Sequence, residues 1–327
     1  MNINFPAKQW TCILGKSGVG KTSLLRLIAN LGYTGSAQTI KKNVSIEATD
    51  HLSLCNRVTY MAQDDLLMPW LNVIDNVTLS FRLQGKSARS YEQEALHMLE
   101  QVGLYEAAFL KPHQISKGMC QRASLARTLL EKKPIVLMDE PFSNLDINLR
   151  KEICNYTLET LKKNDIPVIF VTHDVEEAMS VSDRIIVMKK GKILQIDSPK
   201  RLYHRPNNKC VANMLGSTNQ FEIKADAEGK LSTPFGSVSC NKCISINKFC
   251  QQKKHFCIIR PENIIISKRG VKAKVINKYF LGASWAYQLD LGAKFPILNI
   301  TNCKRELKKN QYIRVNASKK DIFIFQE

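Results

Sequence analysis

The sequence predicts an α/β domain with a mostly parallel sheet, followed by a small all-β domain. Continuous apolar runs at 135–138, 168–171 and 185–188 are typical of strands buried on both faces of a parallel sheet. Helical stretches lie between these runs, which favours an α/β layered arrangement. Beyond about Pro206 the pattern changes to short alternating runs split by glycines and lysines, which indicates a β domain.

The chain of 327 residues suits two domains, which we expect at 1–216 and 217–327. No stretch approaches the roughly 18 apolar residues that a membrane-spanning helix requires. The first residues have no basic region followed by an apolar core, so no secretory signal is expected. Apolar periodicity predicts further elements: a strand at 58–63 and helices within 66–83, 91–102 and 119–131.

Residues 15–22 have the sequence Gly-Lys-Ser-Gly-Val-Gly-Lys-Thr, which fits the phosphate-loop pattern G-x-x-x-x-G-K-[ST]. A strand candidate at 10–14 precedes it and a helix candidate at 23–29 follows. The glycines let successive N–H groups point inward, and the helix adds the positive end of its dipole. The pattern predicts a bound nucleoside triphosphate, with Lys21 at its β- and γ-phosphates and the Thr22 hydroxyl on Mg²⁺. The expected nucleotide contacts are Gly15, Lys16, Ser17, Gly18, Val19, Gly20, Lys21, Thr22 and Ser23.

Two acidic residues follow the apolar run at 135–138. Asp139 closes that strand, where it would hold Mg²⁺ through water, and Glu140 comes next, where it would orient or deprotonate an attacking water. His173 follows the strand at 168–171, at a place from which an imidazole would touch the γ-phosphate. These three residues predict hydrolysis of the bound triphosphate.

In their order and spacing, these motifs resemble those of the ATP-binding subunit of ABC transporters, over about residues 3–216. Residues 15–22 resemble the Walker A loop, and residues 135–139 resemble Walker B. Gln63 resembles the Q-loop glutamine, which in the family contacts Mg²⁺ and senses the membrane partner. The remaining matches are the signature at 115–122, the D-loop at 143–146 and the switch-histidine segment at 172–174.

The resemblance implies a P-loop NTPase fold of the ABC cassette type, with a helical subdomain. It also implies a homodimer in which two ATP molecules lie between two copies. Ser116 and the Gly118 N–H of one copy would contact the γ-phosphate bound by the other. Lys117 stands where the signature has its first glycine, and we expect activity to survive this departure. The implied roles are general base for Glu140, switch for His173, nucleotide contact for Asp146 and Gln63, and metal binding for Thr22, Gln63 and Asp139.

The C-terminal part resembles importer ATPases that carry a regulatory β-barrel of the OB-like TOBE type, on residues 191–219 and on Ile259-Arg-Pro-Glu262. This implies ATP-driven import of a small solute across a bacterial inner membrane. The implied partners are two transmembrane permease subunits and, indirectly, a periplasmic solute-binding protein. The chain would then be cytoplasmic and peripheral on the inner face of the plasma membrane. Residues 68–71 resemble nitrate, sulfonate, taurine and thiamine-precursor importers, whereas the tail resembles sugar, polyamine and ferric-iron importers, so the cargo stays open.

Three other functions compete with import: an exporter motor, a nucleic-acid-associated ABC ATPase, and a regulator with a dead site. The net charge is +19. Of this, +12 comes from Phe221 to the end, a part that has 20 Lys and Arg residues and 8 Asp and Glu residues. Such charge suits nucleic acid, an anionic leaflet or simple solubility. No nucleic acid is expected, because the chain has one phosphate loop and no paired cassette. Intact Lys21, Asp139, Glu140 and His173 argue against a dead site.

Nine of the ten cysteines fall into two groups. Five lie among apolar residues and are expected to fill space in the core: Cys12, Cys55, Cys120, Cys154 and Cys210. Cys240-Asn-Lys-Cys243, Cys250, His255 and Cys257 form a cluster that would suit zinc or an iron–sulfur centre, or consist of reduced, unligated thiols.

Overall fold

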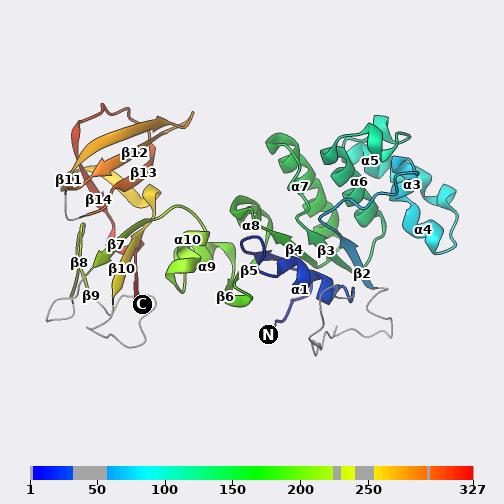
Figure 1. Cartoon of the computed structure of the whole chain (residues 1–327), viewed down its shortest axis with the longest axis horizontal. Helices are drawn as coiled ribbons and strands as arrows, with labels where there is room; N and C mark the ends of the chain where they lie inside the picture. Colours follow the sequence, from blue (N-terminus) through cyan, green and yellow to red (C-terminus); the bar gives the residue numbers. More distant parts are fainter. Residues whose placement is uncertain (1–2, 32–56, 224–229, 240–253, 293–294, 327) are drawn as a thin grey trace. The chain divides into compact units, whose positions relative to one another are not determined.

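The computed structural model describes residues 3–31, 57–223, 230–239, 254–292 and 295–326. The chain divides into two compact units, Met1–Pro199 and Lys200–Glu327 (Figure 1). The domain limits of 1–216 and 217–327 stay a prediction. In the described ranges, no helix is both long enough and apolar enough to cross a membrane.

The first unit is built on a six-stranded sheet with the strand order β2-β3-β4-β1-β5-β6. All neighbouring strands are parallel except β5 and β6, which are antiparallel. This confirms the predicted mostly parallel sheet. The strands are β1 (Trp10–Leu14), β2 (Val58–Met61), β3 (Ile135–Asp139), β4 (Val168–Thr172), β5 (Arg184–Lys189) and β6 (Lys192–Asp197).

Burial on both faces explains the continuous apolar runs of the central strands. Every residue of β1 and of β4 is buried. On one face, Ile13, Leu137 and Ile186 pack against Leu25 of α1 (Lys21–Ile28). The residues that alternate with them face the other side of the sheet. Helix α8 (Val175–Val181) packs on β1 and β4.

The remaining helices of this unit include a group that packs around α6, as Figure 1 shows. This group is the predicted helical subdomain. The further helices are α3 (Val73–Val77), α4 (Leu79–Leu83), α5 (Glu92–Gln101), α6 (Lys117–Leu130) and α7 (Ile147–Lys163).

The apolar pattern within 66–83 predicts one helix, whereas the structure has two short helices, α3 and α4. Thr78 stands between them with φ −89° and ψ 1°, outside the helical region. Its hydroxyl donates to the Ile74 carbonyl at 2.9 Å, so the threonine side chain competes for a helix carbonyl at the point where α3 ends.

In its described part, the second unit consists of short helices followed by antiparallel sheets. The sheet orders are β15-β10-β7, β13-β12-β11-β14 and β8-β9. Apolar side chains from all three sheets form one core that includes Phe221, Leu231 and Val275. The predicted all-β domain is therefore confirmed. The elements are α9 (Pro199–His204), α10 (Lys209–Met214), β7 (Asn219–Ile223), β8 (Lys230–Thr233), β9 (Gly236–Ser239), β10 (His255–Ile259), β11 (Ile264–Phe280), β12 (Trp285–Asp290), β13 (Leu298–Cys303), β14 (Tyr312–Ala317) and β15 (Ile322–Gln326).

The cysteines are only partly core residues. Cys12 and Cys154 are buried, as expected, but Cys120 and Cys210 are half-buried, and Cys55 lies outside the described residues. In the C-terminal cluster, 240–250 is likewise outside them. Cys257 lies in the core of the second unit, where burial raises the pKa of its thiol to about 12. That thiol is therefore protonated at neutral pH.

Candidate active site

The predicted site residues lie where parallel strands of the first unit end. The phosphate loop follows β1, Gln63 follows β2, Glu140 follows β3 and His173 follows β4. Because β1, β2, β3 and β4 run parallel, their carboxyl ends meet at one edge of the sheet, where α/β proteins bind ligands. Residues more than a hundred positions apart are brought together in this way.

The phosphate loop has the backbone that a phosphate cradle needs. Gly18 and Gly20 have φ of +79° and +96°, a region that favours glycine. A side chain at Gly15 would place its Cβ 2.8 Å from the Met188 carbonyl oxygen, so the chain passes β5 too closely for any other residue. Lys16 and Ser17 are exposed.

Lys21 is the cation of the loop. Its side chain is buried, and its Nζ donates to the carbonyls of Gly15 at 2.9 Å and Lys16 at 3.2 Å. Burial lowers the pKa of this ammonium, while the nearby carboxylates of Glu140 and Asp139 raise it. The ammonium thus lies over the curled loop, at the place where phosphates would enter.

Thr22 and Asp139 form an oxygen-rich pair that fits Mg²⁺. The Thr22 hydroxyl donates to Asp139 Oδ1 at 3.1 Å, and Asp139 is fully buried. Burial raises the pKa of the Asp139 carboxyl because it disfavours the charged form. A divalent cation beside the carboxyl would favour the charged form again. Hydroxyl and carboxylate oxygens are the ligands that Mg²⁺ prefers. Gln63 is exposed just after β2, the strand that pairs with β3.

Glu140 has an unusual backbone that its neighbours hold in place. Its φ is +51°, in the left-handed region that non-glycine residues rarely adopt. Its N–H donates to the Val171 carbonyl at 2.9 Å. Its own carbonyl accepts from Gln121 Nε2 at 2.9 Å and from Ser143 Oγ at 3.1 Å. Such strain at the end of a strand is typical of functional sites.

The structure brings Glu140 and His173 into direct contact. His173 Nδ1 lies 3.0 Å from Glu140 Oε1, within hydrogen-bonding distance. The Glu140 side chain is 12% exposed and that of His173 is 55% exposed, so the pair faces solvent from the imidazole side. A carboxylate held by an imidazole next to a phosphate loop can orient a water for attack and take up its proton.

Ser116, Gly118 and Asp146 lie at the starts of helices. Ser116 caps α6 and accepts from the Met119 N–H at 3.2 Å, while Asp146 caps α7 and accepts from the Leu149 N–H at 3.0 Å. Both side chains are exposed. A Cβ at Gly118 would lie 2.9 Å from the Asn144 carbonyl oxygen, so this position also needs glycine.

Sequence reasoning missed Gln121 as a residue of this site. Besides holding the Glu140 carbonyl through its Nε2, its Oε1 accepts from the Asn144 N–H at 3.0 Å. Gln121 is buried on α6. Its side chain therefore joins that helix to Glu140, which follows β3, and to Asn144. It stands within the signature motif, and that position was the only signal available.

Glu177 was also missed, and it is the acid most perturbed by burial near His173. The residue is 8% exposed, and its Oε2 accepts from the Thr172 hydroxyl at 2.7 Å. The pKa of Glu177 is raised to about 7, chiefly by burial; Asp174 and Glu140 contribute to the rise, and the Thr172 hydrogen bond and Arg150 oppose it. Glu176 and Glu177 are adjacent at the start of α8, and the sequence does not indicate which of the two is buried.

We expect the stability of the protein to fall between pH 5 and pH 8 because of Glu177. Glu177 keeps its proton up to about pH 7 in the folded protein, whereas in the unfolded chain it loses the proton near its ordinary pKa of 4.5. The free energy of unfolding therefore decreases as pH rises through this window, by up to about 3 kcal/mol. Urea unfolding at pH 5 and at pH 8 should show that the free energy of unfolding decreases less with pH in Glu177→Gln than in the unchanged protein. Glu176→Gln, which changes an exposed neighbour, is the control, and equal pH slopes in all three proteins would contradict the assignment.

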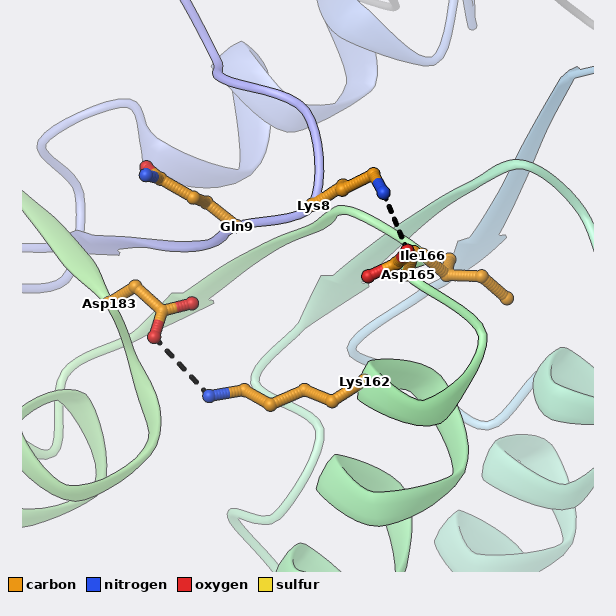
Figure 2. A pocket seen from close by; sticks show the side chains of 6 residues that line it. All are labelled: Lys8, Gln9, Lys162, Asp165, Ile166 and Asp183. Atoms are coloured by element: carbon orange, nitrogen blue, oxygen red, sulfur yellow. Dashed lines mark hydrogen bonds and ion pairs between the residues drawn. The ribbon is translucent and has the colours of Figure 1, made fainter.

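A surface hollow lies at the opposite edge of the sheet, where β1, β4 and β5 begin (Figure 2). Two exposed ion pairs line it, Lys8 with Asp165 at 2.6 Å and Lys162 with Asp183 at 3.3 Å. All four charges are paired, and none of the predicted site residues is near the amino ends of these strands. The hollow is therefore separate from the hydrolysis site.

Trp10 lies outside this site as well. It is 1% exposed and packs edge-on against Phe170, with ring centroids 6.2 Å apart. Its indole is therefore buried in the core of the first unit, and it is unavailable for stacking on a nucleotide base.

The comparison with known proteins agrees with the nucleotide site that the phosphate loop and its neighbours indicate. The family model described as "ABC transporter" matches residues 1–143. The sulfate/thiosulfate import ATP-binding protein CysA of Mannheimia succiniciproducens is 33% identical over 282 residues, which cover 85% of this chain and 78% of the relative. The spermidine/putrescine import ATP-binding protein PotA of Escherichia coli K12 is 34% identical over 272 residues, covering 80% of this chain and 69% of the relative.

Solved structures match the first part of the chain. The dimeric structure of MJ0796, described as a bacterial ABC transporter cassette, is 29% identical with a TM-score of 0.54 and covers 61% of this chain and 88% of its own. A post-hydrolysis state of the same cassette, bound to ADP and Pi, is 28% identical with a TM-score of 0.51 and has the same coverage. The chain is thus similar to cassettes that hold nucleotide.

Proposed function

Because this chain belongs to the ATP-binding subunits of ABC transporters, which are ATPases, we propose that two copies of it bind and hydrolyse ATP to drive import of a small solute. The observation that supports this most is the Glu140–His173 pair at the sheet edge that holds the phosphate loop. A carboxylate paired with an imidazole beside a phosphate loop is suited to activating water against a bound triphosphate.

The proposed dimer completes a site that one copy leaves open. Lys21 and the loop backbone contact one side of a triphosphate, and donors are needed on its outer side. Ser116 is exposed and Gly118 lies two residues after it, at the start of α6, a helix of 14 residues whose N-terminus attracts anions. In the dimer, these groups from the second copy contact the γ-phosphate. The dimeric MJ0796 cassette supports the arrangement by similarity.

Thr22, Asp139 and Gln63 would hold Mg²⁺ in this proposal. Bound there, the ion would neutralise charge on the β- and γ-phosphate oxygens. The fully buried Asp139 carboxylate and the Thr22 hydroxyl would supply oxygen ligands, and their 3.1 Å contact supports placing both around one small ion. Gln63, which is exposed in the segment after β2, would reach the ion from there.

Glu140 is the proposed general base, and His173 holds it while contacting the γ-phosphate. The water that Glu140 orients attacks the γ-phosphorus, its proton passes to the carboxylate, and the β–γ bridging bond breaks toward ADP. Loss of the γ-phosphate removes the contacts that join the two copies. The dimer then opens, and this motion drives the partner in the membrane.

The segment after Gln63 is the proposed contact with the permease. Leu66, Trp70 and Leu83 are 60%, 68% and 79% exposed, an unusual set for a surface without a partner. Arg127 of α6 donates to the carbonyls of Asp65 at 2.9 Å and Leu66 at 3.0 Å. The segment is thereby tied to the helix that begins at the signature motif.

In the whole system, two permease subunits bind the dimer, and a periplasmic binding protein delivers the solute. The chain is then peripheral on the cytoplasmic face of the plasma membrane, and the β domain has a regulatory role. CysA and PotA import solutes of opposite charge by name, so similarity does not select the cargo. Since these relatives serve import, neither export nor nucleic-acid binding is favoured for this chain.

Uptake into proteoliposomes tests the proposal. The chain is reconstituted with its permease subunits, and labelled spermidine and labelled sulfate are offered as probes with their binding proteins. We expect ATP-dependent uptake of one probe and none with Glu140→Gln. ATP hydrolysis that is indifferent to the permease, with no uptake of either probe, would contradict the import function.

A further inference from the structure

We infer that Arg150 is a positioning residue for hydrolysis, because its guanidinium joins the D-loop to the segment that holds His173. Arg150 lies in the first turn of α7, and its backbone N–H donates to the Asp146 carbonyl at 2.8 Å. The side chain is 30% exposed, so it is fixed between two segments and not free in solvent.

The guanidinium makes two separate contacts. Nη2 donates to the Leu145 carbonyl at 3.1 Å, within the D-loop. Nη1 pairs with Asp174 Oδ2 at 3.0 Å, directly after the switch histidine. A planar fork of this kind fixes the distance and the angle between its two partners, which a lysine ammonium would not do.

Asp174 transmits this restraint to His173. Its Oδ1 accepts from the N–H groups of Glu176 at 2.8 Å and Glu177 at 3.2 Å, so it caps α8. Its own N–H donates to the Thr172 hydroxyl at 3.0 Å. The residues on both sides of His173 are therefore fixed, and Arg150 holds the Asp174 carboxylate and thereby links them to the D-loop.

The D-loop end of the link is equally fixed. The Asn144 N–H donates to Gln121 Oε1, and the Asn144 carbonyl lies against Gly118 of the signature helix. Leu145 is the next residue. A displacement of the signature helix or of Asp146 by a second copy would thus reach Arg150, and through Asp174 it would reach His173 and its contact with Glu140.

This inference rests on the roles proposed for Glu140 and His173, and it predicts a separation of kcat from binding. Arg150→Met should lower kcat for ATP between about 10- and 100-fold, because the His173 side chain is no longer held against the base. The KM for ATP and the dissociation constant of a fluorescent ATP analogue should change less than about threefold. Arg150→Lys should restore little of the rate, since it keeps the charge without the fork.

Lys151→Met is the matched control, an exposed cation on the same helix, and should leave kcat unchanged. Asp174→Asn alone should also lower kcat, and the double variant Arg150→Met/Asp174→Asn should be no slower than the slower single variant, because both remove one link. Thermal unfolding of each variant identifies any that is not folded at the assay temperature. Additive effects, an equal loss of ATP affinity, or an unchanged kcat in a folded Arg150→Met would overturn the inference.

His173→Ala separates the two levels of the proposal. If it leaves kcat unchanged, the role of His173 is wrong whatever Arg150 does. If it lowers kcat while folded Arg150→Met does not, the role of His173 stands and the link through Arg150 is wrong.

Discussion

Replacing Glu140 with glutamine is expected to lower the rate of ATP hydrolysis by about 10²- to 10⁴-fold. The amide has nearly the shape of the carboxylate but cannot take a proton from water. Its oxygen can still accept from His173 Nδ1, and the backbone bonds of residue 140 with Val171, Gln121 and Ser143 are unaffected. The site should therefore keep its geometry and its affinity for ATP while it loses its base.

Phosphate release under saturating ATP measures this effect, and a fluorescent ATP analogue measures binding. Glu176→Gln is the matched control, because it makes the same chemical change at an exposed position three residues after His173. We expect that control to hydrolyse ATP at the normal rate. Undiminished phosphate release from Glu140→Gln would remove Glu140 from the role of base.

Replacing Lys21 with alanine is expected to weaken ATP binding by at least about 10²-fold. The ammonium is buried at the mouth of the loop, and its bonds to the carbonyls of Gly15 and Lys16 hold it ready for phosphate oxygens. Charge-assisted bonds to phosphate are among the strongest in proteins, and no water can replace a cation in that position.

Calorimetric titration with ATP compares this variant with Lys8→Ala. Lys8 is an exposed lysine that pairs with Asp165 at the opposite edge of the sheet, so its removal should leave ATP affinity unchanged. The Lys21→Ala protein should also stay folded, because loss of this side chain from the loop should lower the free energy of unfolding only slightly. Wild-type affinity in folded Lys21→Ala would show that the phosphates bind elsewhere.

The strands of the first unit were predictable because burial on both faces leaves a direct trace in the sequence. The runs at 10–14, 135–138 and 168–171 became β1, β3 and β4 with ends within one residue. The phosphate loop was predictable for a different reason, since glycines with positive φ and a lysine at fixed spacing have few other uses.

The second unit was predicted less well. One of the short alternating runs expected beyond Pro206, at 272–276, is part of β11, a strand that runs from Ile264 to Phe280. Gly270, within the same strand, has φ +133° and lies at a bulge where a Cβ would be 2.2 Å from the Val315 carbonyl oxygen. The strand continues through it. Glycine marks a close approach of two backbones here, and the sequence alone does not separate this from a turn.

The contacts that define the site were not predictable from the sequence. The Glu140–His173 contact depends on β3 and β4 being neighbours and on the left-handed backbone of Glu140. The roles of Gln121, Arg150 and Glu177 depend on which way each helix presents them. Periodicity indicates that a face is buried, but not that a polar residue on it has a partner across the site.

The central claim is that two copies of this chain close around bound ATP, and the mass of the Glu140→Gln protein in solution tests it most directly. Light scattering after gel filtration, with saturating ATP and Mg²⁺, should give twice the chain mass of 37.1 kDa, and a single chain mass when nucleotide is omitted. A protein that binds ATP under these conditions yet keeps the mass of one chain would contradict the account.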